Sequence, residues 1–295
     1  MTIADDTQIP VTDPPSEETA VAPPKRERIF RHSAATRITH WINLLCVTML
    51  LFTGLQIFNA HPRLYWGQYG ANADRPFIAM EARHTPDGHL IGVTTIGALR
   101  IETTGVFGAS PSNGQLVARG FPEWLTLPSS RNLAVGRNLH FFFAWFLAIN
   151  GLIYVIASSL SGHLRRDLYL RREELKPRHL LADVWSHIKL HVPRGEESKR
   201  YNTLQKIAYL SVIFLLLPLM ILTGMTMSPA MNSAFPFLLD IFGGRQSART
   251  IHFIVAWSLV LFAAVHLFEI FLVGVFNEVR SMITGWYDVK PEKHS

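Results

Sequence analysis

The sequence of 295 residues predicts an all-α membrane protein, a bundle of four transmembrane helices with a long loop between the first two. A helix needs about 20 predominantly apolar residues to cross a bilayer. Four stretches approach or exceed that length: Trp41–Phe58, Phe141–Leu160, Ile207–Met227 and Ile251–Phe276. The polar tails and two long loops lower the mean hydropathy to +0.18, so this modest average agrees with a membrane protein.

The N-terminal segment, residues 1–30, is acidic and then basic, contains five prolines, and has no apolar stretch of the kind that a secretory signal requires. Such a composition cannot bury enough apolar surface to fold, so we expect a disordered tail. Residues 31–290 are expected to form one membrane domain, and residues 291–295 a short C-terminal tail.

Basic residues predict the orientation of the chain, because cytoplasmic loops are enriched in Lys and Arg. The N-terminal tail and the second loop, residues 161–206, are rich in both, whereas the first loop, residues 59–137, is longer and sparser in charge. Both termini and the second loop are therefore expected in the cytoplasm. The net charge of +6 reflects this topology, because no basic face is interleaved with aromatic residues that would stack on nucleic-acid bases.

The first loop, residues 59–137, is longer than a compact four-helix bundle requires, and loops of this length are usually functional or disordered. Its Gly and β-branched residues, as in "HLIGVTTIGALRIETTGVFG", predict short strands and turns that form a folded extracytoplasmic cap. In the third span, Pro218 predicts a kink, because proline lacks the backbone N–H that continues a helix.

Four histidines lie within the apolar spans or their first turns, where polar side chains are costly. His252 and His266 are 14 residues apart, close to four helical turns, so they share one face of the fourth span about 21 Å apart. The predicted topology places His40 near the inner surface and His140 near the outer one. Depth therefore pairs His40 with His266 and His140 with His252.

Two neutral imidazoles that face each other across a helical bundle are the axial ligands expected of a b-type haem. The alternatives are hydrogen bonds between helices and a zinc site. Zinc is disfavoured because no carboxylate or thiolate completes either pair. Cys46 is the only cysteine, which excludes a C-x-x-C-H haem attachment and a cysteine-ligated iron–sulfur cluster within this chain.

The segments "RITHWIN", "GRNLHFFFAW" and H-x13-H resemble the bacterial cytochrome b561 and nickel-hydrogenase cytochrome b family over about residues 32–290. The resemblance implies that His40, His140, His252 and His266 ligate the iron of two haems b and that the chain exchanges electrons with the quinone pool. The segments "TTGVFG", "RGFPEWLTLP" and "FGGRQSARTIHF" look like a subgroup that accompanies periplasmic molybdopterin oxidoreductases of the sulfite-oxidase type.

Two polar residues near the inner histidines are candidates for a quinone site. Glu269 follows His266 by one turn on the same side of the fourth span and could take up or deliver quinone protons. Asn43 follows His40 by one turn, although an Asn at this position is also suited to bonding a neighbouring helix.

The sequence thus predicts transmembrane electron transfer through two haems b, between an extracytoplasmic partner, a molybdopterin oxidoreductase, and membrane quinone. No catalytic residue is expected in this chain, since substrate chemistry would belong to the partner. The alternatives are a self-sufficient superoxide:quinone oxidoreductase of the cytochrome b561 type, a hydrogenase cytochrome b subunit, and a haem-free membrane anchor or transporter.

Overall fold

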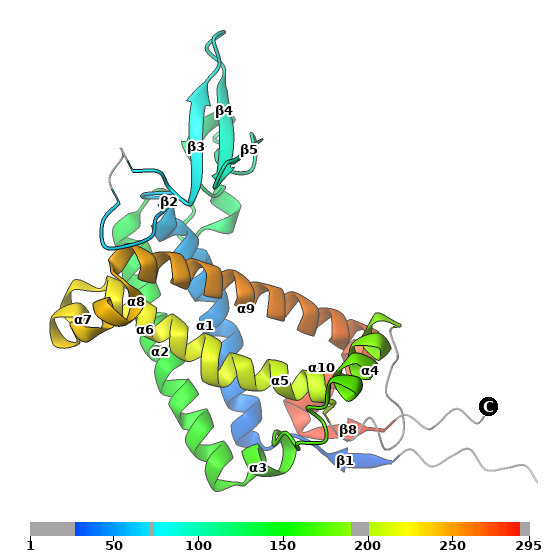
Figure 1. Cartoon of the computed structure of the whole chain (residues 1–295). Helices are drawn as coiled ribbons and strands as arrows, with labels where there is room; N and C mark the ends of the chain where they lie inside the picture. The colour runs from blue at the N-terminus through cyan, green and yellow to red at the C-terminus, as the bar shows by residue number, and fades with distance from the viewer. Residues whose placement is uncertain (1–26, 71–73, 190–200, 290–295) are drawn as a thin grey trace, which may run out of the picture.

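The computed structural model describes residues 27–70, 74–189 and 201–289 and is mostly helical (Figure 1). The four predicted spans correspond to α1 (Ala34–Phe58), α2 (Leu133–Leu160), the continuous run of α5 (Thr203–Ser211), η3 (Val212–Leu216) and α6 (Leu217–Met227), and α9 (Arg245–Val273). All four are long and apolar enough to cross a membrane. The predicted fold class is confirmed.

The helices begin earlier than the apolar runs because polar caps start them. Ser33 accepts a hydrogen bond from the Thr36 amide at the start of α1, and Asn132 accepts one from the Val135 amide at the start of α2. These side chains satisfy backbone donors that the first helical turn leaves unpaired. At the other end, α9 stops at Gly274, whose φ of 128° favours glycine.

The third span changes its hydrogen bonding where the sequence predicts a kink. The five residues of η3, Val212–Leu216, are π-helical and lie directly before Pro218. Proline cannot donate to the carbonyl four residues earlier, and its ring would clash with that carbonyl in an undistorted helix. A local π-helical turn is one adjustment that accommodates such a break in a membrane helix.

The spans are arranged as two helix pairs. Helix α1 packs against α2, and α6 packs against α9, and the two pairs cross at a steep angle in Figure 1. Only 28% of the most apolar window of α1, and 6% of that of the third span, is buried inside the protein. Most of the apolar helix surface therefore remains for contact with lipid or with a bound group.

The two chain ends meet at one end of the bundle, which we call the terminal end. Strand β1 (Arg28–Phe30) pairs antiparallel with β8 (Trp286–Asp288), close to α3 (His163–Asp167) and α10 (Val275–Thr284) (Figure 1). Helix α4 (Pro177–Ile188) belongs to the same loop region. Residues 28–30 thus form a strand within the segment expected as a tail, whereas residues 1–26 and 290–295 lie outside the described residues.

At the opposite end, the cap end, the long first loop folds into small sheets, as predicted (Figure 1). One sheet has the order β2–β3–β4–β5, and a separate hairpin pairs β6 with β7. Their bounds are Arg63–Leu64, Ile78–His84, Leu90–Ile96, Leu99–Glu102, Gly108–Ser112 and Gln115–Arg119. A Cβ on Gly92 would lie 2.1 Å from the Phe107 carbonyl oxygen, so the two sheets approach closely only because glycine is there.

Three short helices complete the cap end: η1 (Glu123–Leu125), α7 (Pro229–Ala234) and α8 (Phe237–Phe242). A buried apolar cluster, Leu55, Phe58, Leu64, Met80 and Phe121, joins the cap to the last turn of α1. Beside it, the side chain of Asn59 donates to the Phe121 carbonyl and accepts from the Phe121 amide. The cap is thus packed directly onto the end of a membrane helix.

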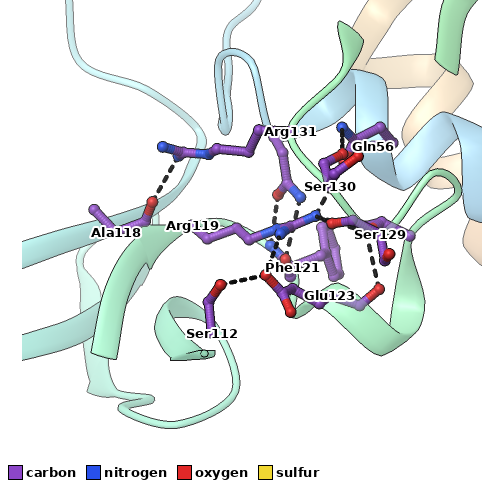
Figure 2. A network of polar contacts seen from close by, with 11 residues as sticks. Gln56, Ser112, Ala118, Arg119, Phe121, Glu123, Ser129, Ser130 and Arg131 are labelled. Carbon is purple, nitrogen blue, oxygen red and sulfur yellow. Dashed lines mark hydrogen bonds and ion pairs between the residues drawn. The ribbon is translucent and has the colours of Figure 1, made fainter. Parts of the chain in front are cut away.

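Arg119 is the centre of the polar contacts that hold the cap in place, as Figure 2 shows. Its side chain donates to Gln56 at 3.1 Å, to Thr126 at 2.7 Å and to the Ser129 carbonyl at 2.7 Å. Gln56 also donates to the Ser130 carbonyl. Since Arg119 is only 4% exposed, these bonds connect β7, α1 and the segment before α2 with little competition from water.

We predict that Arg119→Ala loosens the cap without removing the helices. The substitution leaves several buried acceptors unpaired, which costs about 3 kcal/mol. Amide hydrogen exchange of residues 108–132 should accelerate by about 100-fold, as expected for local opening at that cost. The control is Arg131→Ala, because Arg131 is exposed and donates only to the Ala118 carbonyl among the described contacts. Equal exchange rates in Arg119→Ala and Arg131→Ala would show that Arg119 does not hold the cap in place.

Candidate functional site

The four histidines singled out in the sequence occupy equivalent depths in their helices. His40 lies in α1, His140 in α2, and His252 and His266 in α9, each six or seven residues from one helix end. His252 and His266 lie on one face of α9, separated by about 21 Å along its axis. His40 and His266 lie near the terminal end, and His140 and His252 lie near the cap end, so the four positions fall at two levels in the bundle.

The structure brings the histidines together in two pairs that connect the helix pairs. The ring centroids of His40 and His266 are 6.4 Å apart at the terminal end, and those of His140 and His252 are 6.4 Å apart at the cap end. These are the same pairs that depth predicts. Each pair combines one ring from the α1–α2 pair with one ring from α9.

A centroid separation of 6.4 Å is suitable for one metal ion between two imidazoles. Two metal–nitrogen bonds of about 2 Å, with roughly 1.1 Å from each nitrogen to its ring centre, give a separation of about 6.2 Å. No group of three or more His, Cys, Asp or Glu residues that could hold a metal occurs within the described ranges. Each pair supplies two imidazoles, the number of protein ligands that the iron of a bis-histidine haem takes.

Two threonines orient the rings of the cap-end pair. The Thr53 hydroxyl lies 3.0 Å from Nδ1 of His140, and the Thr223 hydroxyl lies 2.9 Å from Nδ1 of His252. Each hydroxyl donates its single hydrogen to a carbonyl one turn back, that of Met49 or Leu219. It must therefore accept from Nδ1–H, which leaves the Nε2 lone pair of each histidine available for a metal.

Glycines follow both threonines and make room for the rings. A Cβ on Gly54 would lie 3.3 Å from Cε1 of His140, and a Cβ on Gly224 would lie 3.6 Å from Cε1 of His252. These two threonines and two glycines were not predicted as site residues from the sequence. The available signal was the Thr-Gly dipeptide, which occurs within the apolar spans only at Thr53–Gly54 and Thr223–Gly224.

Aromatic rings surround the terminal-end pair. Phe262 stacks on His266 with centroids 5.8 Å apart, and Tyr209 meets the same ring edge-on at 6.3 Å. Trp41 contacts His40 edge-on at 5.8 Å. The two pairs thus share a spacing but differ in their surroundings, with hydroxyl acceptors at the cap end and aromatic contacts at the terminal end.

A cavity of about 260 Å³ opens beside His266. Its polar lining residues are Gln205, Tyr209 and Glu269, and the rest of its wall is mostly apolar. The Gln205 amide donates to the Glu269 carboxylate at 3.4 Å. Glu269, one of the two quinone candidates from the sequence, therefore lies in the wall of a cavity that contacts a paired histidine.

Asn43, the other quinone candidate, contacts the neighbouring helix. The Asn150 side chain of α2 donates to Asn43 Oδ1 at 2.7 Å and to the Thr39 carbonyl at 2.8 Å. These bonds join α1 to α2 near the terminal end. The structure thus gives Asn43 a role in helix packing, as the alternative interpretation of the sequence allowed.

Comparison with known proteins places this arrangement in a family. The family model described as prokaryotic cytochrome b561 matches residues 31–285. A relative from Azospira oryzae, named "Putative protein-methionine-sulfoxide reductase subunit YedZ1", is 27% identical over 254 residues, which cover 86% of this chain and 96% of that protein. "Putative cytochrome YdhU" of Escherichia coli is 25% identical over 264 residues, covering 88% and 75% respectively.

No solved structure matches the chain. The family match spans all four apolar helices and both histidine pairs. The family implies a b-type haem and a role in electron transport, and two opposed imidazoles are suitable protein ligands for such a haem. The chain belongs to the prokaryotic cytochrome b561 family and is a multi-pass membrane cytochrome.

Proposed function

We propose that the chain carries electrons across a bacterial inner membrane through two haems b, between an extracytoplasmic oxidoreductase and the quinone pool. The observation that supports this most strongly is the presence of two histidine pairs with equal 6.4 Å spacing at opposite ends of the bundle. Two such centres lie about 21 Å apart along α9, so each electron transfer would cover a shorter distance than the full thickness of the membrane.

In this proposal His140 and His252 hold the cap-end haem, and His40 and His266 hold the terminal-end haem. A bis-histidine b-type haem supplies reversible one-electron chemistry and leaves no open iron position for a substrate. The protein fixes the cap-end imidazoles through Thr53 and Thr223, and the surrounding apolar helices exclude water.

The cap end is assigned to the periplasm and the terminal end to the cytoplasm. Both described chain ends and α3 lie at the terminal end (Figure 1), where the described residues 161–189 include many Lys and Arg residues. Lys and Arg are enriched on the cytoplasmic side of membrane proteins. The cap then presents a folded surface to the periplasm.

The proposed partner is a periplasmic oxidoreductase, of the molybdopterin type that the subgroup resemblance implies. The name of the Azospira relative, a methionine-sulfoxide reductase subunit, supports a partner with a separate catalytic centre. The segment after Gly244 also contacts the cap, since the amides of Gln246 and Ser247 both donate to the Gly67 carbonyl. The cap and the start of α9 thus form one continuous surface for docking.

The cavity beside His266 is the proposed quinone site. Its volume of about 260 Å³ exceeds the roughly 150 Å³ of an engineered cavity that accepts benzene, so it has room for a substituted ring. Quinol oxidation releases protons, and Glu269 in the cavity wall is positioned to accept them.

We predict that the purified protein contains two haems b per chain and that ligand variants fall into two groups. His40→Ala and His266→Ala should remove the same spectral component, and His140→Ala and His252→Ala should remove the other, because each pair holds one iron. Pyridine haemochrome analysis and low-temperature spectra of the reduced protein measure both. Loss of one component in both His40→Ala and His252→Ala would contradict the pairing.

Thr53→Val and Thr223→Val should each raise the midpoint potential of the cap-end haem. An acceptor on Nδ1–H makes the imidazole a stronger electron donor to iron, which favours the oxidised state, and valine removes that acceptor. The expected shift is tens of millivolts, since about 59 mV corresponds to a tenfold change in a one-electron equilibrium. Thr226→Val is the control, because its hydroxyl bonds only to the Leu222 carbonyl among the described contacts. A redox titration that gives equal potentials in all three variants would overturn this role.

Glu269→Gln should leave both haems bound but slow their reduction by a quinol analogue. The amide keeps the shape of the carboxyl group but cannot accept a proton, which can cost about 100-fold in rate when proton transfer limits turnover. Electron exchange at the cap end should not change, since Glu269 is about 25 Å from His252 along the helix. Stopped-flow spectroscopy measures both rates.

The matched control is Glu173→Gln, which removes an exposed carboxylate that contacts Lys176 at the terminal end. Equal quinol rates in wild type and Glu269→Gln would remove Glu269 from the quinone site. Rapid reduction of the haem by superoxide in the isolated protein would instead favour the self-sufficient superoxide:quinone oxidoreductase.

A further inference from the structure

Three of the four paired histidines follow an arginine by three residues. Arg-x-x-His occurs in the sequence at Arg37–His40, Arg137–His140 and Arg249–His252, and nowhere else. Residues three apart share one face of a helix, about 4.5 Å apart along its axis. Because these histidines lie near the N-terminal ends of α1, α2 and α9, each arginine is one turn closer to the membrane surface than its histidine.

These arginines lack acidic partners among the described residues. None of the ion pairs there includes Arg37, Arg137 or Arg249. Arg37 and Arg249 are partly buried, and each donates to a backbone carbonyl, that of Ile283 or His61. The Nε of Arg37 is buried without a hydrogen-bond partner in this part of the chain. A buried guanidinium is costly unless an anion compensates it.

Arg31, at the same end of the protein, has an anionic partner and aromatic contacts for its guanidinium group. It lies 3.8 Å from the Glu278 carboxylate and over the rings of Tyr201, at 5.4 Å, and Tyr287, at 4.6 Å. The lack of an acidic partner at Arg37 is therefore not shared by every arginine at the terminal end.

His32 adds a second buried polar side chain with an unpaired atom at the terminal end. Its side chain is almost fully buried, with 7% exposure, and its Nδ1 has no hydrogen-bond partner among the described residues. A haem propionate oxygen could satisfy this side chain when its nitrogen carries a hydrogen. Arg37 and His40 are both close enough to interact electrostatically with His32.

We propose that these residues bind the propionate carboxylates of the two haems, Arg137 and Arg249 at the cap end and Arg37 with His32 at the terminal end. The inference rests on the proposed function, since it assumes a b-type haem at each histidine pair. Each haem has two propionate groups, and a guanidinium one turn outward from the iron ligand would neutralise them through charge-assisted hydrogen bonds. Lipid phosphates could supply the same anionic oxygens, so the test must separate the two sources.

The test is a redox titration of the intact protein in lipid nanodiscs, with the two haems distinguished by the histidine variants above. Loss of a positive charge beside a haem favours its oxidised state. Arg249→Gln should therefore lower the midpoint potential of the cap-end haem, and Arg37→Gln that of the terminal-end haem, each by about tenfold in the reduction equilibrium, or about 59 mV. Arg249→Lys and Arg37→Lys keep the charge and should restore most of the wild-type potential.

Arg131→Gln and Arg165→Gln are matched controls, because each removes an exposed arginine from the same end of the protein without a histidine one turn away. Infrared redox-difference spectra of protein containing haem labelled with ¹³C at the propionate carboxyls identify the anion. The labelled bands should shift in Arg249→Gln and Arg37→Gln and not in the controls.

The outcomes separate this inference from the proposed function. A wild-type protein without two b-type components would refute the proposed function itself. Two intact components whose potentials and labelled bands are unchanged in the glutamine variants would refute only the propionate assignment. Unchanged bands together with potentials that depend on anionic lipid would assign the arginines to lipid phosphates instead.

Discussion

A buried imidazole has a donor and an acceptor nitrogen, and both need partners in a membrane where water is scarce. This requirement organises the centre of the protein. At the cap end, Thr53 and Thr223 each use their one hydrogen on their own helix and accept from a histidine Nδ1. Each ring is then fixed with its second nitrogen free for a metal. The adjacent glycines allow the rings to lie against the helices.

The bundle consists of two helix pairs, α1 with α2 and α6 with α9, rather than four equivalent helices. Contacts between small and polar residues join α1 to α2, as with Asn43 and Asn150, while the histidines face across from these helices to α9. The cap stabilises only one end of this arrangement, through the Arg119 contacts and the apolar cluster under it. The other end is joined by the β1–β8 sheet, which contains residues from both ends of the described chain.

The sequence was sufficient for the spans, the histidine pairs and the strands of the cap. Each depends on a periodic or compositional signal: apolar length, a 14-residue interval, or β-branched and glycine-rich segments. The helix starts were placed too late because hydropathy does not detect polar caps such as Ser33 and Asn132. The threonines were missed because a hydroxyl in an apolar span usually bonds its own helix, and only the structure shows that His140 and His252 lie next to these two.

The cavity at Glu269 and the contacts of Arg119 depend on residues from distant parts of the chain. Val184 of α4, Leu204 of α5 and Phe262 of α9 all line the cavity, although they belong to different elements and share no motif. In the sequence, Arg119 likewise resembles an ordinary basic residue of a loop. Its importance becomes clear only from its acceptors, Gln56 on α1 and the Ser129 carbonyl before α2. Such sites require tertiary structure, because no single segment contains their pattern.

One helix contributes a histidine to both pairs, and this has a consequence for how the family can vary in length. A loop can gain or lose residues without moving either centre, because its ends are fixed by other contacts. A single insertion in α9 between His252 and His266 would instead rotate one ring by about 100° relative to the other and turn it away from its partner. Four inserted residues would nearly restore the face but lengthen the interval by about 6 Å. The spacing between His252 and His266 within α9 is therefore fixed by the need to keep both rings facing their partners.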